Sequence, residues 1–156
     1  MDYELLHFPY SPYNEKARWA LDFKGIAHTR TTMLPGPHLG PMRKRTGQTA
    51  TPVLRIGDRY VAGSAAILAE LEHLQPEPRL FPRDAEQARR ALEIQKYFDA
   101  DLAPRIRRAV LAAIIGHPFY TARVFGAGKS AAARFFYGLV FPLARQIGRA
   151  SCRERV

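Results

Sequence analysis

The stretch Thr51-Pro52-Val53-Leu54 decides the fold. It places a proline directly before a β-branched apolar run, although proline cannot donate a hydrogen bond to a sheet ladder. Two geometries explain this order: Pro52 is the first residue of a strand, or a cis Thr51–Pro52 bond turns the backbone there. A cis bond would leave the N–H and C=O of Val53 free to pair with an extended peptide.

Helix starts lie on both sides of this stretch. Upstream, the apolar strand Leu5-Leu6-His7-Phe8 leads into Ser11-Pro12-Tyr13-Asn14-Glu15-Lys16. Ser11 has the position of an N-cap, and Pro12 falls in the first turn, where proline is tolerated. Downstream, Gly63-Ser64-Ala65-Ala66-Ile67 begins a second helix, which we expect Ser64 to cap.

Turn residues and hydrophobic spacing predict the remaining elements of the first half. The strand at His28 to Met33 should be parallel to the first strand, because a helix connects the two. The elements expected before Thr51 are a strand at Tyr3 to Phe8, a helix ending at Gly25, and a loop over 34–50 with a short helix from Met42 to Arg45. A hairpin should then join Thr51 to Ile56 and Arg59 to Ala62 across Gly57-Asp58. The last element is a helix with an apolar stripe of Ile67, Leu68, Leu71 and Leu74.

This order, with the three stretches quoted above, resembles the N-terminal, thioredoxin-like domain of the glutathione S-transferases. The resemblance covers residues 3–83 well and residues 84–146 in outline. It implies an α/β thioredoxin-like N-terminal domain (βαβ-ββα) followed by an incomplete all-α domain. We place the first domain at 1–76, a proline-containing linker at 77–83 and the partial helical domain at 84–146.

The helical half has its own start and stop signals. Asp84 with Gln87 three positions later resembles a capping arrangement. A long helix should follow, kinked at Pro104 and resumed to about Ile115, with Ala91, Ile94, Phe98 and Leu102 on one face. Gly116-His117-Pro118 should break it, and a last helix is expected from Lys129 to Leu139 and on toward Gln146. We expect Trp19 to pack between the first helix and this half.

Residues 147–156 resemble a translated sequencing adapter, with a codon solution for every position, so we interpret them as a non-native tail and place the end of the native portion near Gln146; a natural basic tail is the alternative. Cys152, the only cysteine, lies in this tail. Without cysteines, and with five histidines that lack ligand spacing, a metal site is not expected.

Composition limits the function classes. The 156 residues have no apolar run long enough to cross a bilayer, and the acidic N-terminus is unlike a signal peptide, so we expect a soluble, cytoplasmic protein. The net charge of +10 is spread along helical faces and is typical of a bacterial-like, arginine-preferring proteome. Because exposed aromatics are not interleaved with the basic residues and no nucleic-acid motif is present, nucleic acid is not the expected partner.

The resemblance implies that glutathione is the co-substrate. Its thiol has a pKa near about 8.5, and lowering that pKa by about two units requires roughly 2.7 kcal/mol of thiolate stabilisation. A hydroxyl at a helix N-terminus can supply much of it, which makes Ser11 the first catalytic candidate; Tyr10 and Tyr13 are alternative donors. Residues 11–18 are similar to the Cys-Pro-Phe/Tyr motif of omega-like members, with Ser in place of Cys. Serine cannot form a mixed disulfide, so conjugation or peroxide reduction is favoured.

Three further groups are implied as glutathione ligands. Thr51, cis Pro52 and Val53 would hold the cysteinyl part, with the Val53 backbone pairing as an added strand. Gly63 and Ser64 at a helix N-terminus would hold the γ-glutamyl carboxylate. Most members of the family have an acidic residue at the position of Gly63, and that acid would hold the glutamyl ammonium. Gln48, with Arg43-Lys44-Arg45 and His38 as further candidates, would hold the glycine carboxylate.

Two functions remain open at this point. The first is a glutathione S-transferase that attacks small hydrophobic electrophiles. The second is a glutathione S-transferase-like binding or scaffold protein without catalysis, which the glycine at position 63 keeps open. Dimerisation is usual in the family, so a homodimer is also open, whereas the electrophile itself cannot be read from the sequence.

Overall fold

A computed structural model describes residues 2–140. Four strands form one mixed sheet in the order β2-β1-β3-β4. β1 and β2 are parallel, whereas β3 is antiparallel to both β1 and β4. The strands are β1 (Tyr3–His7), β2 (Thr29–Thr32), β3 (Val53–Ile56) and β4 (Arg59–Ala62).

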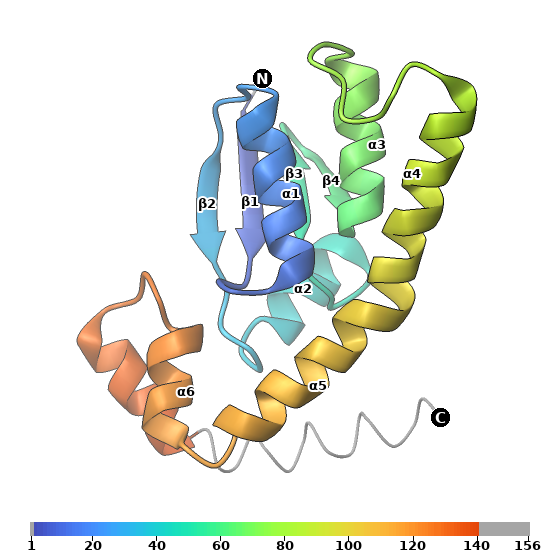
Figure 1. Ribbon diagram of the computed structural model, residues 1–156. Coiled ribbons are helices and arrows are strands. Elements are labelled where there is room, and N and C mark those ends of the chain that lie inside the picture. The colour runs from blue at the N-terminus through green and yellow to red at the C-terminus, as the bar shows by residue number, and fades with distance from the viewer. Residues whose placement is uncertain (1, 141–156) are drawn as a thin grey trace.

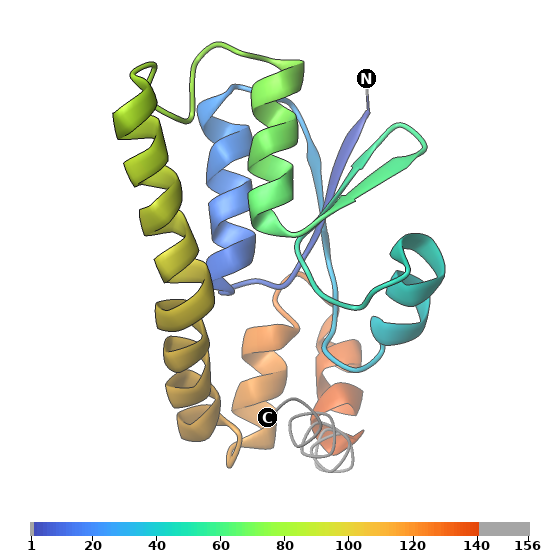
Figure 2. The ribbon, with the colours of Figure 1, turned by 90° about the vertical axis from the view of Figure 1, so that its right-hand side faces the viewer.

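Helices cover both faces of the sheet. α1 (Pro12–Phe23) and α3 (Ser64–Leu74) lie on one face, and α2 (Leu39–Thr46) lies on the other (Figures 1 and 2). This arrangement is the predicted thioredoxin-like plan, and the parallel β2 and the hairpin across Gly57-Asp58 are confirmed. α2 is longer than predicted because Pro41 falls in its first turn, where a missing N–H is tolerated.

The strand period divides the core between the two faces. Leu5 of β1 lies opposite Leu54 of β3, and both pack with α1 and α3. The next pair, Leu6 and Val53, points to the other face and packs with Met42 of α2. Side chains of successive strand residues alternate between faces, so this register fixes both halves of the core at once.

The second half is helical and begins as predicted. The Asp84 Oδ1 atom accepts a hydrogen bond from the Gln87 N–H at 2.9 Å and caps α4 (Ala85–Tyr97). A π-helical segment, η1 (Phe98–Leu102), then joins α4 to α5 (Ala103–Ile114). The disturbance expected at Pro104 is therefore a widened turn just before it, which accommodates a proline that cannot donate an N–H within the helix.

Two short helices complete the described chain. α6 (Pro118–Phe125) follows the predicted break at Gly116 to Pro118, and the pattern analysis did not identify it. Residues 131–140 are helical, two residues later than predicted. The predicted continuation to Gln146 and the tail 147–156 lie outside the described residues. Across residues 2–140, no helix has both the length and the apolar character needed to span a membrane.

The expected packing of Trp19 is wrong. Its side chain is 66% exposed, and the Arg18 guanidinium lies 6.0 Å from its ring centroid. Ala17, Ala20 and Leu21 form the side of α1 that faces the sheet, so position 19 falls on the opposite side of the helix.

Lys24 attaches the linker to the first half. Its side chain is completely buried, and Nζ donates to the carbonyl oxygens of Gln75 at 2.6 Å and Pro78 at 2.9 Å. The same Nζ lies 2.6 Å from the Glu72 carboxylate of α3. The buried ammonium therefore has three acceptors, all of them at the point where the chain leaves α3.

We expect Lys24→Met to lower the free energy of unfolding by about 3 kcal/mol, because it removes the buried ammonium that pairs with Glu72 and donates to the carbonyls of Gln75 and Pro78. Urea denaturation followed by circular dichroism would measure the change. Lys44→Met, at an exposed site on α2, is the matched control and should change stability by less than about 0.5 kcal/mol. Equal stability of the two variants would contradict a structural role for Lys24.

Candidate functional site

The topology brings the ends of several strands and helices together at one end of the sheet. β1 ends there, and α1 begins directly after it. β3 starts there because Leu6 of β1 pairs with Val53, and β4 ends there because Val53 pairs with Ala62. α1 and α3 both begin at this end, and α5 and α6 lie beyond it (Figures 1 and 2).

Thr51 is the residue whose backbone is left open. The Thr51–Pro52 bond is cis, as the resemblance implied. Within residues 2–140, neither the N–H nor the C=O of Thr51 has a hydrogen-bond partner, whereas the Pro52 carbonyl accepts from the Gly63 N–H at 2.9 Å. Val53, predicted to be open, instead pairs with β1 on one side and β4 on the other. The open peptide is therefore one position before the cis proline, and the prediction for Val53 is wrong.

Asn14 links this loop to α1, and the sequence analysis did not single it out. Its side chain is fully buried, and Nδ2 donates to Thr51 Oγ1 at 3.2 Å. Its Oδ1 has no protein partner among the described residues. The sequence did contain a signal, because Asn14 is a polar residue on the same helical side as Ala17 and Leu21. A buried amide with one unmet acceptor lies directly beside the open peptide.

Ser11 has the backbone conformation of an N-cap, but its side chain does not make the predicted capping bond. Its carbonyl accepts from the N–H groups of Asn14 and Glu15 at 3.0 and 2.9 Å. Its φ of −91° and ψ of 125° are extended, and no hydrogen bond engages its hydroxyl within the described part of the chain. The Ser11 hydroxyl is thus free at the positive end of the α1 dipole.

Tyr13, the alternative hydroxyl donor, already has an acceptor. Its O–H donates to the backbone carbonyl of Asp99 in η1 at 2.6 Å. Burial, and then the negative charge of Asp99, raise the pKa of Tyr13. Lys16, one turn later on α1, lies 2.6 Å from the Asp99 carboxylate. These two contacts hold the first turns of α1 against the π-helical segment.

The start of α3 supplies a second helix N-terminus. The helix begins at Ser64, so Gly63 occupies the cap position and the prediction that Ser64 is the cap is wrong. Gly63 has φ of +93°, a conformation that glycine adopts without strain. Ser64 is only 5% exposed. The first backbone N–H groups of a helix have no partner within it, so this end of α3 can accept an anion.

Gln48 shapes the loop that leads to Thr51. Its Nε2 donates to the Ala50 carbonyl at 3.0 Å and to Thr46 Oγ1 at 3.2 Å, and its Oε1 accepts from the Ala50 N–H. Both ends of the amide are therefore engaged within the loop. His38 is similarly occupied, with its two ring nitrogens 3.1 Å from the carbonyls of Leu34 and Thr49. Of the suggested ligands for a glycine carboxylate, Arg43, Lys44 and Arg45 remain exposed on α2.

His7 ends β1 close to the start of α1 and is nearly buried. Its side chain is 8% exposed, and Nδ1 has no partner among the described residues. Burial lowers the pKa of His7, and the positive charge of Arg30 lowers it further. Both effects favour the neutral form of the imidazole. In the described part of the chain, no group of three His, Cys, Asp or Glu side chains is placed to hold a metal ion.

The fold and these termini define a class: a thioredoxin-like domain with an open peptide before a cis proline, followed by helices. A sequence model described as the glutathione S-transferase N-terminal domain matches residues 5–79. Residues 5–79 are therefore identified as a domain of the glutathione S-transferase N-terminal type.

Solved structures give the same fold. A Tau class glutathione S-transferase of mango, Mangifera indica, is 19% identical with a TM-score of 0.63, and the match covers 78% of this chain and 61% of that one. A glutathione S-transferase of Methylobacterium radiotolerans, in complex with glutathione sulfonate, is 25% identical with a TM-score of 0.60, covering 88% and 60%. A bacterial Zeta class maleyl pyruvate isomerase is 24% identical with a TM-score of 0.61, covering 80% and 62%.

The chain thus spans about three fifths of the length of these proteins. A comparison with curated protein sequences gives no significant match.

We expect the lowered pKa of His7 to appear in the pH dependence of the free energy of unfolding. Unfolded histidine titrates near about pH 6.5 and folded His7 titrates lower, so the unfolded chain binds the extra proton first. The contribution of His7 to the free energy of unfolding should be fully present above about pH 6.5. It should be lost as the pH falls toward and through the folded pKa. His7→Gln should flatten this fall in urea titrations, whereas His73→Gln, at an exposed site on α3, should not. The same slope in all three proteins would refute the assignment.

Proposed function

We propose that this protein binds glutathione where α1, α3 and Thr51 meet and activates its thiol for reaction with small hydrophobic electrophiles. The observation that carries the proposal is the unpaired Thr51 backbone, which lies between two helix N-termini. The complex of the Methylobacterium radiotolerans relative with glutathione sulfonate supports it. The domain limits of 1–76 and 84–146 are part of the same proposal.

The peptide backbone of glutathione has a matching partner at Thr51. An extended ligand can add to exposed N–H and C=O groups as a further strand, which fixes its direction and depth. The buried Asn14 amide holds the Thr51 side chain and so fixes the position of the loop. In this proposal Pro52 and Val53 support the loop from the sheet, and Thr51 makes the backbone contact.

The α3 N-terminus is suited to a carboxylate of the same ligand. Backbone N–H groups and the positive end of the helix dipole favour a negative charge there. Ser64, at the first position of α3, can add its hydroxyl. We therefore assign the γ-glutamyl carboxylate to Ser64 and Gly63. Because Gln48 is engaged within its own loop, its role is to shape the approach to Thr51 rather than to bind the glycine end.

Thiol activation falls to Ser11. Its free hydroxyl and the α1 dipole both stabilise a thiolate more than a neutral thiol, and about 2.7 kcal/mol of such preference lowers the thiol pKa by two units. Tyr13 is less suited, because its hydrogen is donated to Asp99. The chemistry is nucleophilic attack by the glutathione sulfur on an electrophile, or peroxide reduction.

A second function is favoured by one observation, the absence of an acid at position 63. Without a carboxylate there, the glutamyl ammonium of bound glutathione has no assigned partner, which would weaken binding. The chain would then be a glutathione S-transferase-like binding or scaffold protein. Retention on immobilised glutathione without turnover of 1-chloro-2,4-dinitrobenzene would support this alternative, and retention with turnover would support the enzyme.

Ser11→Ala should lower kcat/KM for 1-chloro-2,4-dinitrobenzene by about 100-fold, because about 2.7 kcal/mol of thiolate stabilisation is lost. Ultraviolet absorbance of the bound thiolate should show its pKa rising toward about 8.5. Ser130→Ala, a serine substitution outside the site, is the control and should leave turnover unchanged. If Tyr13→Phe abolishes turnover while Ser11→Ala does not, the assignment of the hydroxyl is wrong.

Gly63→Glu and Gly63→Gln form a matched pair that tests the ammonium site. Both put a side chain at φ of +93° and should cost about 1–2 kcal/mol of stability, although no atom lies within 4 Å of an added Cβ. Only Glu adds a charge, so calorimetry should show glutathione binding about fivefold tighter to Glu than to Gln. A deaminated glutathione should bind both variants equally. Equal glutathione affinity would show that the ammonium lies elsewhere.

A further inference from the structure

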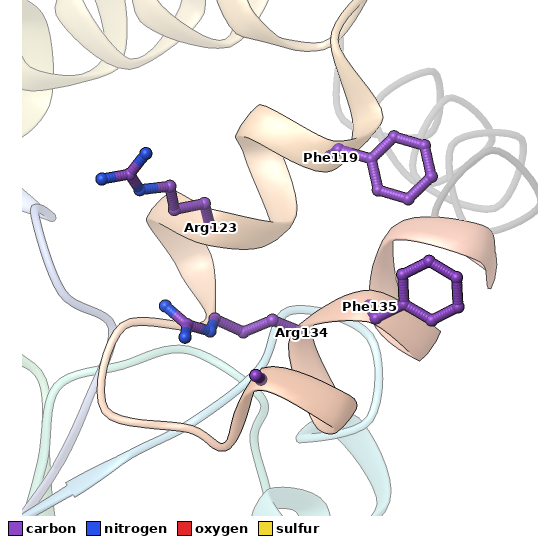
Figure 3. Close-up of a pocket in the computed structure, with 5 residues that line it drawn as sticks. Phe119, Arg123, Arg134 and Phe135 are labelled. Carbon is purple, nitrogen blue, oxygen red and sulfur yellow. The ribbon is translucent and has the colours of Figure 1, made fainter.

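A groove of about 400 Å³ lies between α6 and the helix at 131–140 (Figure 3). α6 contributes Phe119 and Arg123, four positions apart, and the second helix contributes Ala131, Arg134 and Phe135. Each helix therefore presents one guanidinium and one phenyl ring to the same space. Figure 3 shows both guanidinium groups extending to one side and both rings at the other end of the groove.

The two guanidinium groups lack anionic partners. Neither Arg123 nor Arg134 forms an ion pair within residues 2–140, whereas Arg18, Arg55 and Arg59 do. No acidic residue lines the groove. From Leu102 to Arg153 the sequence contains no Asp or Glu at all. Among the described residues, an acidic side chain at this place would therefore have to come from before Leu102.

The groove side chains are held by close contacts with glycines. A Cβ at Gly126 would lie 2.7 Å from Cγ of Arg134, so the Arg134 stem rests directly on the end of α6. A Cβ at Gly138 would lie 2.9 Å from Cδ1 of Phe119, so that ring rests on the second helix. The Phe119 and Phe135 rings are stacked at 6.1 Å, yet they remain 55% and 54% exposed. The apolar surface is therefore ordered and open.

We propose that this groove binds a small organic anion with an aromatic ring and a carboxylate. Guanidinium groups fit the planar carboxylate geometry with paired, charge-assisted hydrogen bonds. The stacked phenylalanines offer apolar area to the ring of the ligand. The volume lies in the range of small-ligand sites, roughly 300–1,000 Å³. The site uses no residue assigned to glutathione, so it should be occupied with or without that peptide.

The test uses 2-naphthoate and its uncharged analogue 2-naphthalenemethanol as probes on the full chain. Calorimetry without glutathione should detect 2-naphthoate, and ¹⁵N spectra should show shifts at the Nε–H signals of Arg123 and Arg134. Arg123→Gln and Arg134→Gln should each weaken 2-naphthoate about tenfold, and together more, without affecting the alcohol. Arg108→Gln, at an exposed site on α5, is the control for net charge and should have no effect.

Phe135→Ala should weaken both probes, because the ring contact is shared, and circular dichroism would confirm that each variant folds. Higher ionic strength should weaken the binding of 2-naphthoate and leave the binding of 2-naphthalenemethanol unchanged. The proposal is overturned if 2-naphthoate does not bind at millimolar concentration, if Arg108→Gln weakens it as much as the groove variants do, or if the alcohol binds equally well.

Discussion

The pairing of β3 between β1 and β4 is the constraint on which the site depends. Since Val53 pairs with Leu6 and with Ala62, the end of β1, the start of β3 and the end of β4 meet at one end of the sheet. The helices that follow β1 and β4 must then begin there as well. Two positive helix ends flank a peptide that has no hydrogen-bond partner among residues 2–140, and this arrangement is suited to an extended, anionic peptide. The hydrogen bond from the Gly63 N–H to the Pro52 carbonyl fixes the start of α3 against the loop that carries Thr51.

Most of the fold could be predicted because its signals are local. Pro52, the Ser11-Pro12 start and the glycine turns each restrict the backbone within a few residues, and together they define the strand and helix order. The wrong predictions concern which strands pair and which way a side chain points, and both depend on residues far away in the sequence. Val53 was expected to be open because its place within the ladder depends on β1, some distance away in sequence. Trp19 was expected to be covered, although Ala17 and Leu21 already form the buried side of α1.

For the candidate site, the order of elements predicted which residues lie near one another but only some of their contacts, and the roles of these residues stay predictions. Ser11, Thr51 and Ser64 do come together at one end of the sheet, as expected from the order of elements. Asn14 was missed because its partner, the Thr51 hydroxyl, belongs to another element, and no spacing rule connects the two. The engagement of Gln48 with Ala50 was also hidden, since the direction of a loop side chain depends on the turn itself.

Asp99 makes the position of the catalytic candidate depend on the second half of the chain. Its carbonyl accepts from the Tyr13 hydroxyl, and its carboxylate lies 2.6 Å from Lys16 Nζ, so both groups of one residue hold α1. Asp99 lies in the π-helical segment, whose widened turn directly precedes Pro104. Ser11 is only two residues from Tyr13, and a rigid first turn restricts where its hydroxyl can point. Through one π turn, the helical half therefore restrains the helix that carries the group proposed to activate the thiol.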